Sequence, residues 1–254
     1  MDVIYILWLR QLKRYVRSRA RIVGSLGQPL LFLVALGFGF GPIYARAGGG
    51  DYIQFLAPGI IAMGILFTAM FSGIEVLWDR QFGFLKETLV APVSRRQVML
   101  GRTLGGASVA TLQGVIVFVL TFGVGFRPAH AAELPLALVM MFMTAVLFTA
   151  LGTAVASVLE DMQGFQLIMN FLVMPMFFLS GALFPLAGLP RSAGLPRSIG
   201  LVARIDPLSY GVDGIRGALV GGSHFTLIVD AGVLGAFVVV LLTIGSYLFS
   251  RIQV

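Results

Sequence analysis

Six apolar runs, each long enough to cross a membrane as a helix, constrain this chain more than any other feature. A hydrocarbon core about 30 Å thick takes roughly 20 helical residues to span. The runs lie at about 22–45, 53–77, 104–126, 134–158, 166–187 and 227–249. Only 11% of the residues are charged, whereas soluble domains carry about 25%. We therefore expect an all-α polytopic membrane protein with six transmembrane helices in a single domain, residues 1–254.

Lysine and arginine are distributed unevenly between the segments that connect these runs. Twelve lie in the N-terminal segment, after the second run and at the C-terminus, against six in the other connectors. Cytoplasmic segments carry the excess of these residues. We therefore expect a multi-pass protein of a prokaryotic cytoplasmic (inner) membrane with both termini cytoplasmic and 188–226 outside. Because the basic charge follows the topology, we expect it to lie beside the lipid bilayer, and no nucleic-acid partner is expected.

The basic N-terminal segment, 4–21, has the pattern of an amphipathic helix. Tyr5, Trp8, Leu12 and Tyr15 recur at helical spacing, and arginines and lysines follow a similar period on another face. This arrangement predicts an interfacial helix, with its apolar face in the acyl boundary and its cations at the headgroups. A basic tail that only fixes the topology is the alternative.

The connector after the second run begins with a short amphipathic helix. Its apolar face carries Phe82, Leu85 and Leu89, and its opposite face carries Arg80 and Glu87. Such a pattern is not needed for a simple link between two membrane spans. The alternative is a surface helix that packs on its own bundle.

The same connector, 79–102, also contains a sharp break. Pro92 cannot continue the preceding helix. Ser94 followed by Gln97 then predicts a capping box, in which a new helix begins at Arg95 and continues into the third span. The sequence therefore predicts a rigid cytoplasmic protrusion built from two helices.

The outer connector, 188–226, is amphipathic rather than polar. Leu208, Val212, Ile215 and Leu219 share one helical face. We expect short re-entrant helices here, one of them running from Pro207 to about Leu219. The alternative is a structured loop that caps the bundle.

Catalytic and cofactor-binding patterns are absent from the sequence. The two lysines, Lys13 and Lys86, do not follow a glycine, so the chain has no G-x-x-x-x-G-K-[ST] phosphate-binding loop. The histidines His130 and His224 lie in outer loops, away from any serine nucleophile or metal site within the membrane. We expect no enzyme activity, no metal site and no cofactor bound by this chain.

Four blocks of the sequence resemble the permease subunits of type-2 ABC exporters, above all the daunorubicin-resistance and nodulation-factor export branch. The blocks are "FLAPGIIAMG" (55–64), "DRQFGFLKETLVAPVSRRQVMLGR" (79–102), "FFLSGALFPLAGLP" (177–190) and "DPLSYGVDGIRGAL" (206–219). The second block is the most specific. It departs from the family pattern at Gln81, where an acidic residue is expected.

The resemblance implies a partner and a role for the connector. It implies that 79–102 is a coupling segment that docks on a separate ABC-type ATPase subunit, which holds ATP and Mg. The residues expected to transmit motion are Arg80, Phe82, Leu85, Glu87, Leu89 and Pro92. A second copy of the chain (a homodimer) or a related permease would complete an exporter of amphipathic or lipidic substrates. The alternative is a channel or secondary carrier that works without an ATPase.

The second and fifth spans are expected to line the translocation pathway. The candidate pathway residues recur at helical spacing in each span: Met63, Phe67, Phe71, Asn170, Met174 and Phe177. Ordinary packing within the helix bundle is the alternative for both stripes.

Overall fold

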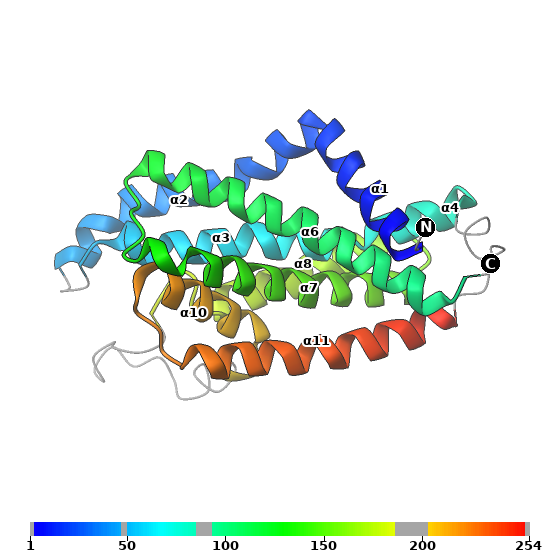
Figure 1. Ribbon diagram of the computed structural model, residues 1–254. Coiled ribbons are helices and arrows are strands. Elements are labelled where there is room, and N and C mark those ends of the chain that lie inside the picture. The colour runs from blue at the N-terminus through cyan, green and yellow to red at the C-terminus, as the bar shows by residue number, and fades with distance from the viewer. Residues whose placement is uncertain (1–2, 47–49, 85–92, 186–202, 252–254) are drawn as a thin grey trace.

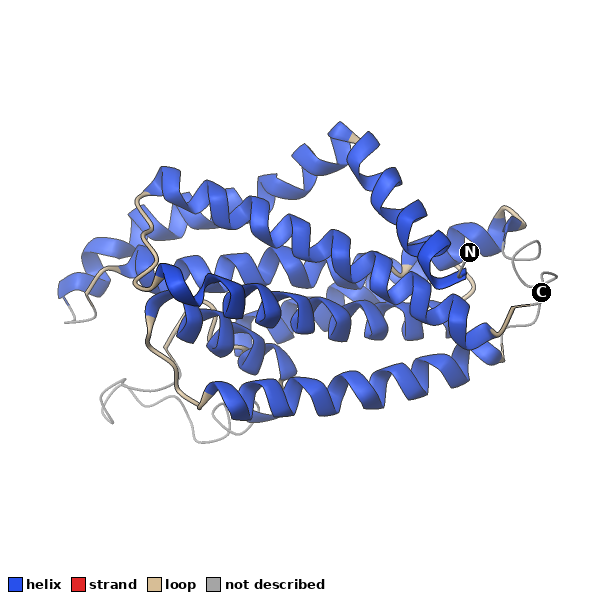
Figure 2. Cartoon of the chain, viewed as in Figure 1, coloured by secondary structure: helices blue, strands red, loops and turns tan. Residues whose placement is uncertain are grey.

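The computed structural model describes residues 3–46, 50–84, 93–185 and 203–251 (Figure 1). The α-helices are α1 (Val3–Arg17), α2 (Arg19–Arg46), α3 (Tyr52–Phe71), α4 (Ile74–Gln81), α6 (Arg95–Thr121), α7 (Leu134–Val158), α8 (Met162–Leu179), α10 (Pro207–Val220) and α11 (Leu227–Ser250). Two short 3-10 helices, η1 (Phe122–Val124) and η2 (Ala131–Glu133), lie between α6 and α7. Within the described ranges every regular element is a helix (Figure 2). Six helical segments are long and apolar enough to cross a membrane, which confirms the all-α membrane fold.

The ends of the bundle divide the connecting segments into two sets. The start of α1, the ends of α4 and α11 and the turn between α7 and α8 lie at one end, which we call the terminal end (Figure 1). The α2–α3 junction, the end of α10 and the turn between α10 and α11 lie at the opposite end. This grouping is the one expected from an even number of crossings.

The second span is interrupted, although the sequence predicts it as continuous over 53–77. Helix α3 ends at Phe71 and α4 begins at Ile74. A Cβ atom on Gly73 would lie 2.3 Å from the Gly152 carbonyl oxygen, and one on Gly152 would lie 2.3 Å from that of Met70. The two backbones therefore touch, as small residues allow in membrane bundles. The break contains no proline. We attribute it to the close contact with α7.

Helix α6 begins as the sequence predicts. Ser94 accepts a hydrogen bond from the Gln97 backbone N–H, and the Gln97 side chain accepts one from the Ser94 backbone N–H. This reciprocal capping box satisfies two of the N–H groups that a helix start leaves open. The first turn of α6 is thereby fixed within the predicted coupling segment, 79–102.

Helix α1 packs along α6. Trp8 Nε1 donates to Ser108 Oγ at 2.9 Å, and the buried Tyr15 hydroxyl donates to Gln113 Oε1. A Cβ atom on Gly101 would lie 3.0 Å from Leu7 Cβ, so the glycine permits the close approach. The apolar face of the predicted interfacial helix therefore covers α6, and the depth of α1 in the membrane stays a prediction.

Helix α10 is enclosed by α3, α7 and α11. Its predicted apolar face, formed by Leu208, Val212, Ile215 and Leu219, is fully buried. Asp213 accepts hydrogen bonds from the backbone N–H groups of two residues beyond the helix, His224 and Phe225, at 2.7 to 2.9 Å. These bonds fix the turn that leads into α11. The predicted helix over 207–219 is confirmed, and its insertion into the outer leaflet stays a prediction.

Helix α8 contacts the bundle through one narrow stripe. The buried residues of this stripe are Phe165, Met169, Val173 and Phe177. The flanks of the helix carry exposed apolar side chains, of which Leu167 and Phe171 are the most exposed. Much of α8 therefore faces away from the rest of the chain.

Candidate functional site: an amphipathic pocket and a charged coupling region

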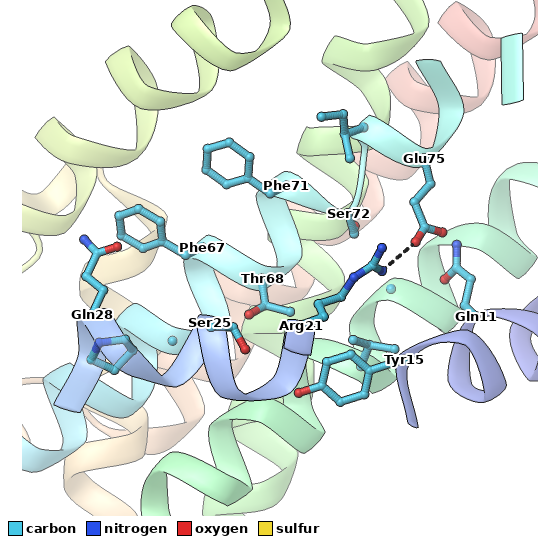
Figure 3. A pocket seen from close by; sticks show the side chains of 16 residues that line it. Gln11, Tyr15, Arg21, Ser25, Gln28, Phe67, Thr68, Phe71, Ser72 and Glu75 are labelled. Carbon is cyan, nitrogen blue, oxygen red and sulfur yellow. Dashed lines mark hydrogen bonds and ion pairs between the residues drawn. The ribbon is translucent and has the colours of Figure 1, made fainter. Parts of the chain in front are cut away.

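A pocket of about 370 Å³ lies between the α1–α2 bend and helices α3, α4 and α6 (Figure 3). The bend forms because α1 ends at Arg17 and α2 begins two residues later, at Arg19. The turn between them is closed by a hydrogen bond from the Ser18 N–H to the Tyr15 carbonyl oxygen. Pockets for small ligands in proteins range from about 300 to 1,000 Å³. The volume therefore suits a small molecule or part of a lipid.

One side of the pocket is aromatic and apolar. Phe67 and Phe71 stack on successive turns of α3, with ring centroids 6.3 Å apart and planes 8° apart. Phe71 also meets the edge of Phe165 on α8. Pro29 and Gly64 complete this side. The surface offers flat apolar contact to a hydrophobic group.

The other side of the pocket is charged. Arg21 on α2 pairs with Glu75 on α4 at 3.1 Å, and Arg14 on α1 lies 3.8 Å from the same carboxylate (Figure 3). Burial raises the pKa of the Tyr15 hydroxyl above its ordinary value, so it stays protonated and donates to Gln113. Glu75 is the one carboxylate that lines the pocket. A single carboxylate beside two guanidinium groups does not make a metal site.

Next to the pocket, Asp79 on α4 binds two arginines from different helices. Arg102 on α6 donates to Asp79 Oδ2, and Arg10 on α1 donates to Asp79 Oδ1 at 3.3 Å. The Asp79 and Arg102 side chains are 8% and 5% exposed. A buried charge is retained only where it is paired and hydrogen-bonded. This cluster therefore connects α4 to α1 and α6.

Arg80, a predicted coupling residue, connects α4 to the turn between α7 and α8. Its Nη2 pairs with Glu160 at 3.2 Å, and its Nη1 donates to the Leu159 carbonyl oxygen at 3.4 Å. Together, Asp79 and Arg80 place the last turn of α4 in contact with three other parts of the bundle. A displacement of this turn would therefore shift its contacts with α1, α6 and the α7–α8 turn.

Aromatic side chains are exposed where α4 ends. Trp78 is 42% and Phe82 is 64% exposed, and their rings lie 5.7 Å apart. The next residue of the chain, Gly83, has a positive φ of 79°, which glycine adopts without strain and which turns the chain after α4. The coupling predictions for Leu85, Glu87, Leu89 and Pro92 lie outside the described residues.

The six predicted pathway residues fall into different environments. Phe67 and Phe71 line the pocket, whereas Met63, on the same helix, is buried in the core. On α8, Asn170 and Met174 are exposed and Phe177 is buried. The structure brings together two of the six, and the pathway assignment stays a prediction.

Sequence reasoning missed the pairing of Asp79 with Arg102. The two residues are 23 positions apart and lie on different helices. The sequence does contain a signal for this pair. Asp79 and Arg102 are oppositely charged, each lies beside an apolar run, and they stand at the two ends of the 79–102 block. Buried opposite charges at the ends of two successive spans on one side of a membrane are well placed to pair.

The chain was compared with known proteins. A family model described as ABC-2 type transporter matches residues 2–220. The chain is 27% identical over 248 residues to Nodulation protein J of Rhizobium leguminosarum bv. viciae, covering 96% of this chain and 93% of the relative. It is 26% identical over 236 residues to the inner membrane transport permease YadH of Escherichia coli (strain K12), covering 92% and 89%. It is 30% identical over 207 residues to the putative transport permease ycf38 of Porphyra purpurea, covering 79% and 68%.

Proposed function

The chain belongs to the ABC-2 type transporter family, and on this basis we propose that it is the membrane-spanning subunit of an ATP-driven exporter. ATP and Mg bind to a separate ABC-type ATPase subunit, and the chain moves an amphipathic or lipidic substrate out of the cytoplasm or the inner leaflet. The match across residues 2–220 is the observation that carries this proposal, and the permease names of relatives support it.

The end of α4 supports a role in coupling to the ATPase. Trp78 and Phe82 expose apolar surface at the terminal end, where a partner would exclude water from it. Asp79 and Arg80 contact α1, α6 and the α7–α8 turn. A push on the coupling segment would therefore reach the helices that bound the pocket.

A second copy of the chain is the proposed membrane partner. Helices α2 and α8 both carry rows of exposed apolar side chains, and they approach each other where the ring of Phe32 meets Phe177 at 6.2 Å. Lipid covers such surfaces in a monomer, and a second copy covers part of them in a dimer. We place the dimer in a prokaryotic inner membrane with both termini cytoplasmic.

Assembly with the ATPase tests the proposal. The tagged chain is purified in mild detergent with the ATPase encoded beside its gene, and bound ATPase and substrate-stimulated ATP turnover are measured. Burying a leucine in an interface contributes about 2–5 kcal/mol, and 1.4 kcal/mol corresponds to tenfold in affinity. Leu85→Ala with Leu89→Ala is therefore expected to weaken assembly at least about tenfold.

Glu87→Ala serves as the matched control, since an exposed ion pair contributes only about 0–1 kcal/mol. A double mutant that inserts normally and keeps both ATPase capture and turnover would remove the coupling role from 79–92. The alternative, a channel or secondary carrier without an ATPase, would then be preferred. Transport by the purified chain alone, driven by an ion gradient, would favour it further.

A further inference from the structure

We infer that the pocket between the α1–α2 bend and α3 is an entry site for an amphipathic molecule with an anionic headgroup, such as a phosphate or carboxylate. This inference rests on the proposed export function and specifies the substrate class. The headgroup lies at Arg21, which lines the pocket, and the apolar part lies on Phe67 and Phe71. Arg14 lies outside the pocket lining, on the same carboxylate as Arg21. The site belongs to one chain and needs no second copy to be complete.

The charge balance at the polar side favours an anion. Arg14 and Arg21 face one carboxylate, that of Glu75, and Arg14 is 3.8 Å from it, beyond hydrogen-bonding distance. A guanidinium carries five N–H donors, so both arginines retain donors for a ligand. Residues 3–45 contain no aspartate or glutamate and carry six arginines and lysines, all between Arg10 and Arg21. Their summed field concentrates anions at the mouth of the pocket.

The shape of the pocket favours an amphipathic ligand over a free anion. The stacked rings of Phe67 and Phe71 lie at one side, and the Arg21–Glu75 pair lies at the other (Figure 3). An inorganic anion would occupy only the charged side and leave the aromatic surface uncovered. A headgroup with the first part of an acyl chain covers both.

The opening of the pocket lies on α2. Gly24 and Gln28 line the pocket and are both exposed. A Cβ atom on Gly24 would meet nothing within 4 Å. Because α2 is a membrane-span candidate, this opening faces the lipid near the terminal end. A lipid-like molecule can therefore enter sideways from the leaflet.

Photolabelling tests the inference. The full chain in nanodiscs is exposed to photoreactive phosphatidylglycerol or to photoreactive phosphatidylcholine with the same acyl chains, and labelled peptides are mapped by mass spectrometry. We expect the anionic lipid to label α2 and α3 about tenfold more strongly than the zwitterionic lipid, as expected for a charge-assisted contact. Equal labelling by the two lipids would overturn the inference.

Two pairs of variants locate the site. Gly24→Leu places a side chain into the pocket, whereas Gly27→Leu adds the same side chain on the same helix outside the pocket, where a Cβ also meets nothing within 4 Å. Arg21→Gln removes a pocket charge, whereas Arg17→Gln removes one from the neighbouring surface. Gly24→Leu and Arg21→Gln are expected to abolish the preference, and their controls to keep it. Labelling unchanged in Gly24→Leu would refute the site.

Competition identifies the source of the anion. Dodecyl phosphate is expected to displace the label at concentrations where inorganic phosphate has no effect; displacement by inorganic phosphate alone would overturn the amphipathic class.

Labelling requires neither nucleotide nor ATPase, so its outcome is independent of the exporter assignment. If the chain binds no ATPase but is still labelled at the pocket, the exporter proposal is rejected and the ligand site stands. Export that Gly24→Leu leaves unchanged would reject the pocket as an entry site and keep the exporter.

Discussion

Arg102 on α6 donates a hydrogen bond to Asp79 on α4, and both side chains are almost completely buried. The pair joins α4 and α6, the helices on which the two ends of the predicted coupling segment, 79–102, lie. Arg10 on α1 contacts the same carboxylate from the other side. The end of α4 and the first part of α6 are therefore held together by one buried charge cluster.

Removal of one partner of this pair is expected to destabilise the bundle. Asp79→Ala leaves the Arg102 guanidinium buried without its carboxylate, which costs about 3–5 kcal/mol in comparable cases. Asp79→Leu combined with Arg102→Met is expected to lose less, because neither charge remains. Glu160→Ala, which removes an 82% exposed partner of Arg80, is the control. The measurement is the fraction that stays monodisperse in detergent after heating, and equal losses in all three variants would contradict the expectation.

The backbone contact between α3 and α7 is expected to reject even one added methyl group. Gly73→Ala and Gly152→Ala each place a Cβ atom 2.3 Å from a carbonyl oxygen, so the helices must separate. Overpacking of this kind costs about 1–3 kcal/mol or more. Gly27→Ala, where the added atom meets nothing within 4 Å, should be neutral or slightly stabilising. Thermal stability of the purified variants measures the difference, and a neutral Gly73→Ala would show that the break can relax.

The two ends of the bundle are expected to face opposite sides of the membrane. The chain has no cysteine, so single cysteines report without background. Gln81→Cys lies at the terminal end, and Gly222→Cys lies at the opposite end; both positions are exposed. An impermeant maleimide added to intact cells should label Gly222→Cys alone, and Gln81→Cys should react only after lysis. Labelling of Gln81→Cys in intact cells would show that the predicted orientation is wrong and that the terminal end faces outward.

Stability is expected to fall between about pH 4 and pH 7 because of Asp206. Burial raises the pKa of this carboxyl group to about 7, whereas an exposed aspartate titrates near about 3.9. The folded state therefore binds the proton more tightly. The contribution is complete below about pH 4 and is lost by about pH 7. At about 1.36 kcal/mol per pKa unit, it amounts to about 4 kcal/mol.

Asp206→Asn separates this titration from the capping role of the same side chain. Asp206 caps α10 by accepting from the Leu208 N–H at 2.9 Å, and asparagine caps equally well. The variant should be more stable than the wild type above pH 7 and should show a flatter profile between pH 4 and 7. Thermal unfolding across this pH range measures both curves, and parallel curves would exclude Asp206 as the titrating group.

Local signals in the sequence predicted local structure well. The Ser94–Gln97 capping box and the start of α10 at Pro207 depend on residues within one helical turn, and both are found where the sequence places them. The six apolar runs likewise predicted the spans, because the length of a run and the absence of charge suffice. Such features need no knowledge of tertiary neighbours.

Features that depend on distant residues could not be predicted in this way. The break at Gly73 follows from the approach of Gly152, 79 positions later, and nothing in the intervening sequence indicates it. The pocket could not be predicted either, because Arg21 and Glu75 lie on different helices and the sequence does not give the distance between them. Asn170 is a further case: packing within the bundle is the alternative that the sequence allows for it, but the residue is exposed because another stripe of α8 meets the bundle.

The pairing of α1 with α6 also sets an order of events during synthesis. Trp8 and Tyr15 bind residues that follow them by 100 and 98 positions. At about 5–20 residues per second, the ribosome needs on the order of 5–20 s to supply that partner. During this interval the nascent amphipathic helix has only the bilayer surface to cover its apolar face. Synthesis of the third span is therefore the step that first supplies the partners of Trp8 and Tyr15.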